Sequence, residues 1–230
     1  MLPFIIAGIV VAGAATATAT YYKKKRRPFP ESPSQGPHSD PKPLGDFAVW
    51  GQPDTGKTTF ISCLRGTVPP TEKKEQTTSI RRYSKFEISN RDGQTYQVTQ
   101  LCDIPGGDDR LQNWLTEIES RKHIFYIVSL AKFDDSQYLR HVKSDIKHTV
   151  ERLKGIKDSK RIHIIGAHLD NSKWKSFEPA RVREVILQDD AIREIRENLG
   201  EGVGYFYAAN LLDPSSATQL IEDIINDCGA

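Results

Sequence analysis

The sequence has few cysteines and no bias of charge, and each of these shortages excludes a class of protein. Its 230 residues include only Cys63, Cys102 and Cys228. Because the number is odd and the spacing is not that of metal ligands, a disulfide framework is excluded and reduced, buried thiols are expected. The formal net charge is only +2, so nothing indicates a nucleic-acid-binding surface. The length favours one domain with appendages.

The first 22 residues lack charged side chains. They are about as many as a helix needs to cross a bilayer, and the basic cluster at residues 23–27 follows directly. Under the positive-inside rule this cluster keeps the C-terminal side in the cytoplasm. A cleaved signal peptide is the alternative, because Ala17-Thr18-Ala19 resembles a cleavage site, but signal peptides carry their positive charge before the apolar segment. We therefore expect a single transmembrane anchor at residues 1–22 with its N-terminus outside.

A basic and proline-rich linker is expected next, at residues 23–44. Six prolines lie among Ser, Gly, Asp and Lys in residues 28–44, with little apolar content. Such a segment forms no packed core and is typical of an extended tether. The globular domain is then expected at residues 45–230, held away from the membrane surface.

Residues 51–58 read G-Q-P-D-T-G-K-T, which matches the phosphate-binding loop pattern G-x-x-x-x-G-K-S/T at every fixed position. An apolar run at residues 47–50 precedes the loop and a helical pattern follows it, as the motif requires. We expect Lys57 to reach the β- and γ-phosphates and Thr58 to offer its hydroxyl to Mg²⁺. A glycine-rich turn with a solvated lysine is the alternative. The nucleotide-binding residues predicted here are Gly51, Gln52, Pro53, Asp54, Thr55, Gly56, Lys57, Thr58 and Thr59.

A second motif ends a predicted hairpin. Alternating runs at residues 81–89 and 95–101 flank a turn signal at residues 90–93. The second run leads into Asp103-Ile104-Pro105-Gly106. Asp103 is suited to hold a metal-bound water, and Gly106 lets a backbone N–H approach the γ-phosphate. D-x-x-G is common as a plain turn, but its position after the phosphate-binding loop favours the functional interpretation.

The rest of the chain alternates strands with helices. Strands are expected at residues 124–130, 161–167 and 205–208, with amphipathic helical patterns between and after them. Together with the hairpin, this order predicts an α/β fold: a mostly parallel central sheet with one antiparallel hairpin strand and helices on both faces. Ligands on such sheets bind at the carboxyl ends of the strands, where all the motifs end.

Across residues 47–227 the order of motifs resembles the Ras-like small GTPases of the P-loop GTPase superfamily. The resemblance implies that GTP/GDP and Mg²⁺ are bound. Thr78 resembles the switch I threonine that completes the Mg²⁺ shell, with Thr77 a close second, and Asp103 to Gly106 resemble the start of switch II. The N-terminal anchor, Thr78-Ser79-Ile80 and D-x-P-G are also similar, more loosely, to the signal recognition particle receptor β subunit.

The base-reading motifs are less complete. Asp170 corresponds to the aspartate that reads guanine, and Ala208, Ala209 and Asn210 to the loop whose backbone N–H meets guanine O6. The usual N/T-K-x-D reads Ala167-His168-Leu169-Asp170, in which Ala167 supplies no bracing hydrogen bonds while His168 can cover one face of the base. Asp170 still favours guanine over adenine, because adenine leaves buried polar groups unpaired. ATP remains the alternative.

The family's water-orienting Gln is replaced by Gly107, which predicts slow hydrolysis. The expected function is a membrane-anchored small GTPase that hydrolyses GTP slowly and acts as a switch for an unidentified protein partner at the membrane. Two alternatives stay open: a non-catalytic docking subunit that holds GTP as a structural ligand, and an ATP-binding accessory of a membrane complex. The residues assigned to chemistry are Lys57, Thr78 and Gly106, and those assigned to the metal are Thr58, Thr78 and Asp103.

Overall fold

The computed structural model describes residues 40–67, 79–154, 156, 160–200 and 203–229. The expected anchor, most of the expected linker and the switch I candidates Thr77 and Thr78 lie outside these residues. None of the helices in the described residues has the length and apolar character needed to span a bilayer.

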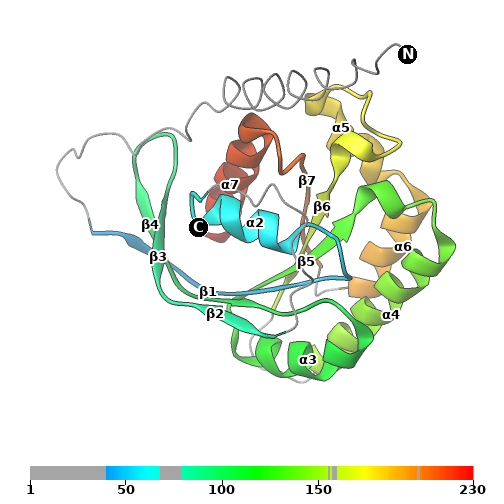
Figure 1. The fold of residues 1–230 in the computed structure, drawn as a ribbon, viewed down its shortest axis with the longest axis horizontal. Helices are drawn as coiled ribbons and strands as arrows, with labels where there is room; N and C mark the ends of the chain where they lie inside the picture. Colours follow the sequence, from blue (N-terminus) through cyan, green and yellow to red (C-terminus); the bar gives the residue numbers. More distant parts are fainter. Residues whose placement is uncertain (1–39, 68–78, 155, 157–159, 201–202, 230) are drawn as a thin grey trace, which may run out of the picture. The chain divides into compact units, whose positions relative to one another are not determined.

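The described strands form one seven-stranded sheet in the order β2-β4-β1-β5-β6-β7, with β3 also paired to β4 (Figure 1). Strands β2 and β3 run antiparallel to β4, and all other neighbours are parallel. This arrangement confirms the predicted α/β fold with a mostly parallel sheet, while the single hairpin strand expected at residues 81–89 is divided into β2 and β3. The strands are β1 Lys42–Trp50, β2 Arg81–Tyr83, β3 Phe86–Ser89, β4 Thr95–Asp103, β5 His123–Ser129, β6 Ile162–Ala167 and β7 Val203–Ala208.

Helices cover both faces of the sheet, as the alternating pattern predicted. Helices α2 and α7 pack on one face, and α3, α4, α5 and α6 contribute to the core on the other (Figure 1). The α-helices are α2 Lys57–Leu64, α3 Leu111–Ser120, α4 Ser136–Leu153, α5 Pro179–Leu187, α6 Asp190–Leu199 and α7 Pro214–Cys228, and the short 3₁₀ helices are η1 Asp108–Arg110, η2 Leu130–Lys132 and η3 Leu169–Asn171.

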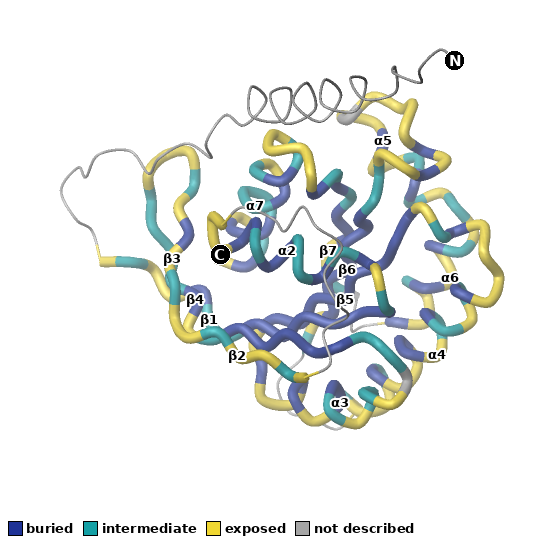
Figure 2. Tube along the Cα trace, viewed as in Figure 1, coloured by how far each residue is buried: buried dark blue, intermediate teal, exposed yellow. Residues whose placement is uncertain are grey.

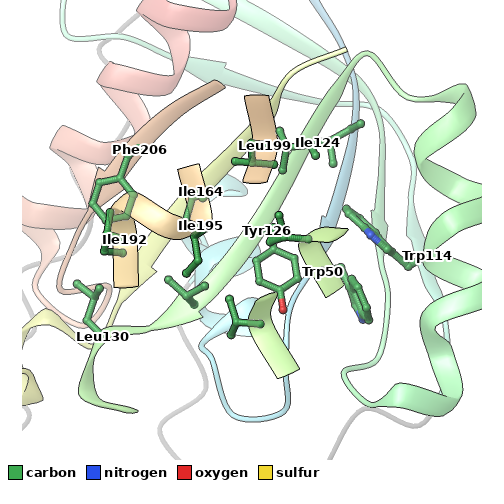
Figure 3. Packing of buried hydrophobic residues seen from close by; sticks show 14 of the residues in the cluster. Trp50, Trp114, Ile124, Tyr126, Leu130, Ile164, Ile192, Ile195, Leu199 and Phe206 are labelled. Atoms are coloured by element: carbon green, nitrogen blue, oxygen red, sulfur yellow. The ribbon is translucent and has the colours of Figure 1, made fainter. Parts of the chain in front are cut away.

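Two hydrophobic cores flank the sheet, because successive side chains of a strand point to opposite faces. Along β1, Phe47 and Val49 belong to the core under α2 and α7, whereas Ala48 and Trp50 belong to the core under α3 and α4. Figure 2 shows the central strands buried and the outer surfaces of the helices exposed. In Figure 3, Trp50 lies beside Trp114 of α3, with ring centroids 5.2 Å apart.

Local signals explain where the helices begin. Asp135 caps α4 by accepting from the N–H groups of Gln137 and Tyr138, and Asp213 caps α7 by accepting from the N–H of Ser216. Helix α2 begins at Lys57 instead, after the N-cap residue Gly56, whose φ of 92° is left-handed and which supplies no side-chain cap. The first amides of the helix therefore remain available to the loop before it.

Strand β1 begins earlier than the sequence pattern indicated. The apolar run starts at Phe47, yet β1 pairs with β4 from Lys42 onward, opposite Tyr96. Leu44, placed in the expected linker, is fully buried. The reason is tertiary: β4 is nine residues long and offers a partner to the preceding segment, which pairs despite Pro43. Elsewhere, the expectation of free, buried cysteines is confirmed for all three.

Candidate nucleotide-binding site

The strand register brings the motifs to one edge of the sheet. Val49, just before the phosphate-binding loop, lies opposite Asp103 at the end of β4. Further along, Gly166 of β6 lies opposite Ala208 of β7. Because these strands are parallel, their following loops meet at the carboxyl edge, where ligands bind in open α/β sheets. The loops that follow β1, β4, β6 and β7 therefore lie along one edge of the sheet.

The phosphate-binding loop has the backbone of an anion-binding turn. Its residues Gly51, Asp54 and Gly56 all have positive φ, of 153°, 60° and 92°, and such turns direct successive N–H groups inward. A Cβ on Gly51 would lie 2.1 Å from the Ile127 carbonyl oxygen, so no larger residue fits. Thr55 closes the turn by donating from its hydroxyl to Gln52 O at 3.0 Å.

Lys57 is tied to the same loop. Its ammonium donates to Gly51 O at 2.9 Å and to Gln52 O at 2.8 Å. A lysine has three N–H donors, so one remains for an anion at the mouth of the loop. Burial lowers the pKa of Lys57 to about 8, and the carboxylates of Asp103 and Asp54 oppose that shift. The side chain is thus in place before any ligand arrives.

Asp103 lies beside Lys57 at the end of β4. It is 1% exposed, and neither of its carboxylate oxygens has a hydrogen-bond partner among the described residues. Burial raises its pKa, an effect opposed by Lys57 and Arg81. Buried polar groups normally have partners, and hydrated Mg²⁺ supplies water donors to an acidic oxygen of this kind. Asp103 therefore fits the metal site, with the half-buried Thr58 in the first turn of α2; Thr78 lies outside the described residues.

The loop after Asp103 rests directly on the phosphate-binding loop. A Cβ on Gly106 would lie 2.7 Å from both Gly51 O and Pro53 N. The indole N–H of Trp50 donates to Pro105 O at 3.2 Å and holds the loop from below. Glycine at position 106 is therefore required by contact between two backbones, in addition to any role toward phosphate.

A buried carboxylate that the sequence analysis missed supports the phosphate-binding loop from α4. One oxygen of Asp145 accepts from the Gln52 amide at 2.6 Å and from the Tyr126 hydroxyl at 2.5 Å. The backbone carbonyl of Asp145 accepts from the Thr149 hydroxyl at 2.7 Å. The oxygen of that hydroxyl in turn accepts from the indole N–H of Trp114 at 2.8 Å. The sequence signal that could have identified Asp145 was the presence of a carboxylate on the apolar face of α4, next to Ile146.

Two of the base-reading candidates, His168 and Asp170, lie in the loop that follows β6. His168 has φ 57°, and its Nε2 lies 3.6 Å from where a Cβ on Gly56 would be. That nitrogen is buried without a partner among the described residues. Asp170, in η3, is exposed and accepts from the Asn171 side-chain amide at 3.1 Å. The loop therefore places an imidazole beside the phosphate-binding loop and a carboxylate at its outer rim.

A pocket of about 610 Å³ brings Asp170 together with Ala208 and Asn210. The backbone amides of this last loop already have partners: Ala209 N–H donates to Gly166 O, and Asn210 N–H to the Ser216 hydroxyl, both at 2.9 Å. In this conformation the loop lines the pocket without offering either amide to a ligand. The loop at residues 208–210 therefore lies near Asp170, and its role toward the base stays a prediction.

A buried group at the opposite edge of the sheet resembles a metal site. The ligand atoms of His123, His163 and Cys228 all lie within 4.8 Å of one another. However, His163 Nδ1 accepts from Tyr205 N–H at 3.2 Å, so in the neutral ring the proton is on Nε2, which faces Cys228. His123 Nε2 donates to Leu44 O at 3.0 Å. With these tautomers both Nε2 atoms act as hydrogen-bond donors, and the group is a hydrogen-bonded part of the core.

Residues 46–167 match the model of a family described as 50S ribosome-binding GTPase, and the match spans more than half of the 230 residues. The chain therefore belongs to this family of GTPases. Together with the fold, this confirms the resemblance to Ras-like P-loop GTPases.

Two solved structures share the fold. The Arl6 BBS3 small GTPase from Trypanosoma brucei, with a bound GppNp analogue, is 14% identical with a TM-score of 0.54, over 80% of this chain and 96% of that one. The mammalian SRP receptor is 16% identical with a TM-score of 0.55, over 78% of this chain and 99% of that one. No curated protein matched the sequence.

Proposed function

We propose that the protein is a guanine-nucleotide switch that binds GTP and GDP with Mg²⁺ and hydrolyses GTP slowly. The supporting observation is a phosphate site with three parts. Lys57 is bonded across the loop, Gly106 packs on it, and the carboxylate of Asp103 is buried beside it with no hydrogen-bond partner in the part of the chain that the structure describes. Arranged donors of this kind bind the terminal phosphates without reorganisation.

Each predicted site residue has a role in this proposal. The amides of residues 51–59 and Lys57 bind the phosphates, and the amide of Gly106 approaches the γ-phosphate. Thr58, Thr78 and Asp103 hold Mg²⁺, which when bound neutralises charge on the phosphates. His168, Asp170 and the loop at residues 208–210 enclose the base.

Binding and base preference are tested together by releasing the nucleotide from the purified full-length chain and identifying it by chromatography. We expect guanine nucleotide, and we expect Lys57→Ala to lose most of it because the loop then lacks its cation. Lys147→Ala, an exposed change on α4, serves as the control. Recovery of adenine nucleotide would favour the ATP-binding alternative, and unchanged retention in Lys57→Ala would refute the site itself.

Slow turnover follows from Gly107, which has no side chain to orient water. The same observation favours the second candidate, a docking subunit in which bound GTP is structural. Phosphate release in single-turnover experiments separates the two. A switch hydrolyses GTP slowly and faster with its partner, whereas a docking subunit retains GTP intact under both conditions.

Membrane attachment through residues 1–22 belongs to the same proposal and rests on the uncharged run followed by residues 23–27. The full-length chain is expected to float with membranes in a density gradient and to resist extraction at high pH. A chain that lacks residues 1–22 is expected to stay in the soluble fraction. A shortened mature protein that leaves the membrane would instead support the signal peptide.

A further inference from the structure

A second pocket, of about 490 Å³, lies beside the phosphate-binding loop. One wall consists of Gln52 and Pro53 of that loop and of Gly107. Ras-like enzymes place the water-orienting Gln at the position of Gly107. Here a Cβ at this position would lie 2.8 Å from the carboxylate of Asp109, which pairs with Arg110 at 3.1 Å. The facing wall comes from η2 and the start of α4, and consists of Lys132, Asp135, Gln137, Tyr138 and His141.

Lys132 is the cation of this wall. It is half-buried, and its ammonium lies 5.7 Å from the centre of the Tyr138 ring, a distance at which the ring attracts it. Tyr138 is itself fixed, because its hydroxyl accepts from Ser129 N–H at 2.7 Å. No ion pair of Lys132 with a carboxylate occurs within the described ranges of the chain.

The neighbouring carboxylates are engaged elsewhere. One oxygen of Asp135 accepts from the N–H groups of Gln137 and Tyr138 at the start of α4. Asp134 pairs with Lys173 at 3.4 Å. The positive charge of Lys132 is therefore not matched locally by a carboxylate contact of its own.

Lys132 and Lys57 border the same loop. Lys57 donates to Gly51 O and Gln52 O, and Lys132 lines the pocket whose other wall includes Gln52 and Pro53. Like charges that share a site are relieved by an anion held between them. Lys57 occupies the floor of the phosphate-binding loop, and Lys132 the wall of the adjoining pocket.

We propose that Lys132 faces the terminal phosphate of the bound nucleoside triphosphate from the pocket beside Gly107 and determines the preference for the triphosphate over the diphosphate. The inference rests on the proposed function, because it needs a nucleotide in the loop. A cation at this place interacts with charge that a diphosphate lacks, and so it separates the two nucleotide states. The same charge stabilises the transferring phosphoryl group.

The test compares the affinities for a non-hydrolysable GTP analogue and for GDP, measured by calorimetry on the full-length chain with Mg²⁺. Lys132→Ala is expected to weaken binding of the analogue about tenfold and that of GDP by less than about twofold, as for loss of one charge at a partly exposed site. Lys132→Arg is expected to restore the ratio. Lys147→Ala, which does not line the pocket, is expected to leave both affinities unchanged.

Equal losses for the two nucleotides, or no loss, would overturn the role of Lys132. That failure is distinct from a failure of the proposed function, in which the wild-type chain binds neither nucleotide. Unfolding midpoints of all variants are measured alongside. If Lys132→Ala is unstable, Lys132→Gln keeps most of the side-chain stem and reports the same ratio.

Discussion

Two imidazoles in the core make stability depend on pH at the scale of single residues. Burial lowers the pKa of His123 and of His163 to about 4, from an ordinary value of 6.5. Between these values the unfolded chain binds protons that the folded chain excludes. The stability that the folded chain gains by keeping both imidazoles neutral is fully present above pH 6.5 and is lost as the pH falls toward 4.

We therefore predict that the free energy of unfolding decreases between pH 6.5 and pH 4, by up to about 3 kcal/mol for each imidazole. His163→Phe should reduce the slope of this decrease, since it removes one titrating group and keeps a ring beside Phe125. Urea unfolding at several pH values measures the slope. His148→Gln, an exposed change on α4, should leave it unaltered; equal slopes in His163→Phe and wild type would contradict the prediction.

Residue identity at Gly51 and Gly106 is decided by backbone proximity. At either position a larger residue would place its Cβ within 3 Å of another backbone segment. A pattern match indicates that glycine belongs at such a position, and the structure supplies the distance that makes it necessary.

At the scale of elements, α4 supports the phosphate-binding loop through a single oxygen of Asp145. That oxygen accepts from both Gln52 and Tyr126, so the helix, the loop and β5 share one acceptor. A buried donor that loses its acceptor costs about 1–3 kcal/mol. The position of the loop therefore depends on a helix that is remote from it in the sequence.

Asp145→Ala is predicted to lower the free energy of unfolding by about 3 kcal/mol, because two buried donors lose their acceptor. Tyr126→Phe alone should cost about 1 kcal/mol, and in the double variant the losses should not add, since both changes disrupt one hydrogen bond. Urea unfolding of the four proteins gives the coupling. Simple additivity would show that the two side chains act independently.

At the scale of the whole molecule, an aromatic path joins the nucleotide site to the core under α3 and α4. Trp50 donates to Pro105 O and stacks on Trp114, which donates to Thr149. A movement of the loop that carries Gly106 thus changes the surroundings of two tryptophans. Trp174 lies elsewhere, in the wall of the pocket that contains Asp170.

We predict that replacing GDP with a non-hydrolysable GTP analogue changes the intrinsic tryptophan fluorescence. Trp50→Phe should remove most of the change, because the link to Pro105 is lost. Trp174→Phe should retain it, since Trp174 lies in the wall of the pocket that contains Asp170, where our proposal puts the base that both nucleotides share. A signal that survives in Trp50→Phe and disappears in Trp174→Phe would contradict the prediction, because the response would then come from Trp174.

Particular residues show how far sequence reasoning reached. The strand, loop and helix around Lys57 and the hairpin ending at Asp103 were both predicted, since each depends on neighbours within a few residues. Asp145, Lys132 and the burial of Leu44 were not. Each of these depends on a partner remote in the sequence: Gln52, the space beside Gly107, and the length of β4.

By itself, the sequence determined the class of protein, because phosphate binding needs consecutive amides and a lysine at fixed spacing on one short segment. It also determined the alternating layers, because hydrophobic periodicity is local. Tertiary structure alone decided which charges are buried without partners, which helix supports the loop and which amides after β7 are already bonded. These are properties of surfaces that meet only after folding, and local spacing along the chain does not encode them.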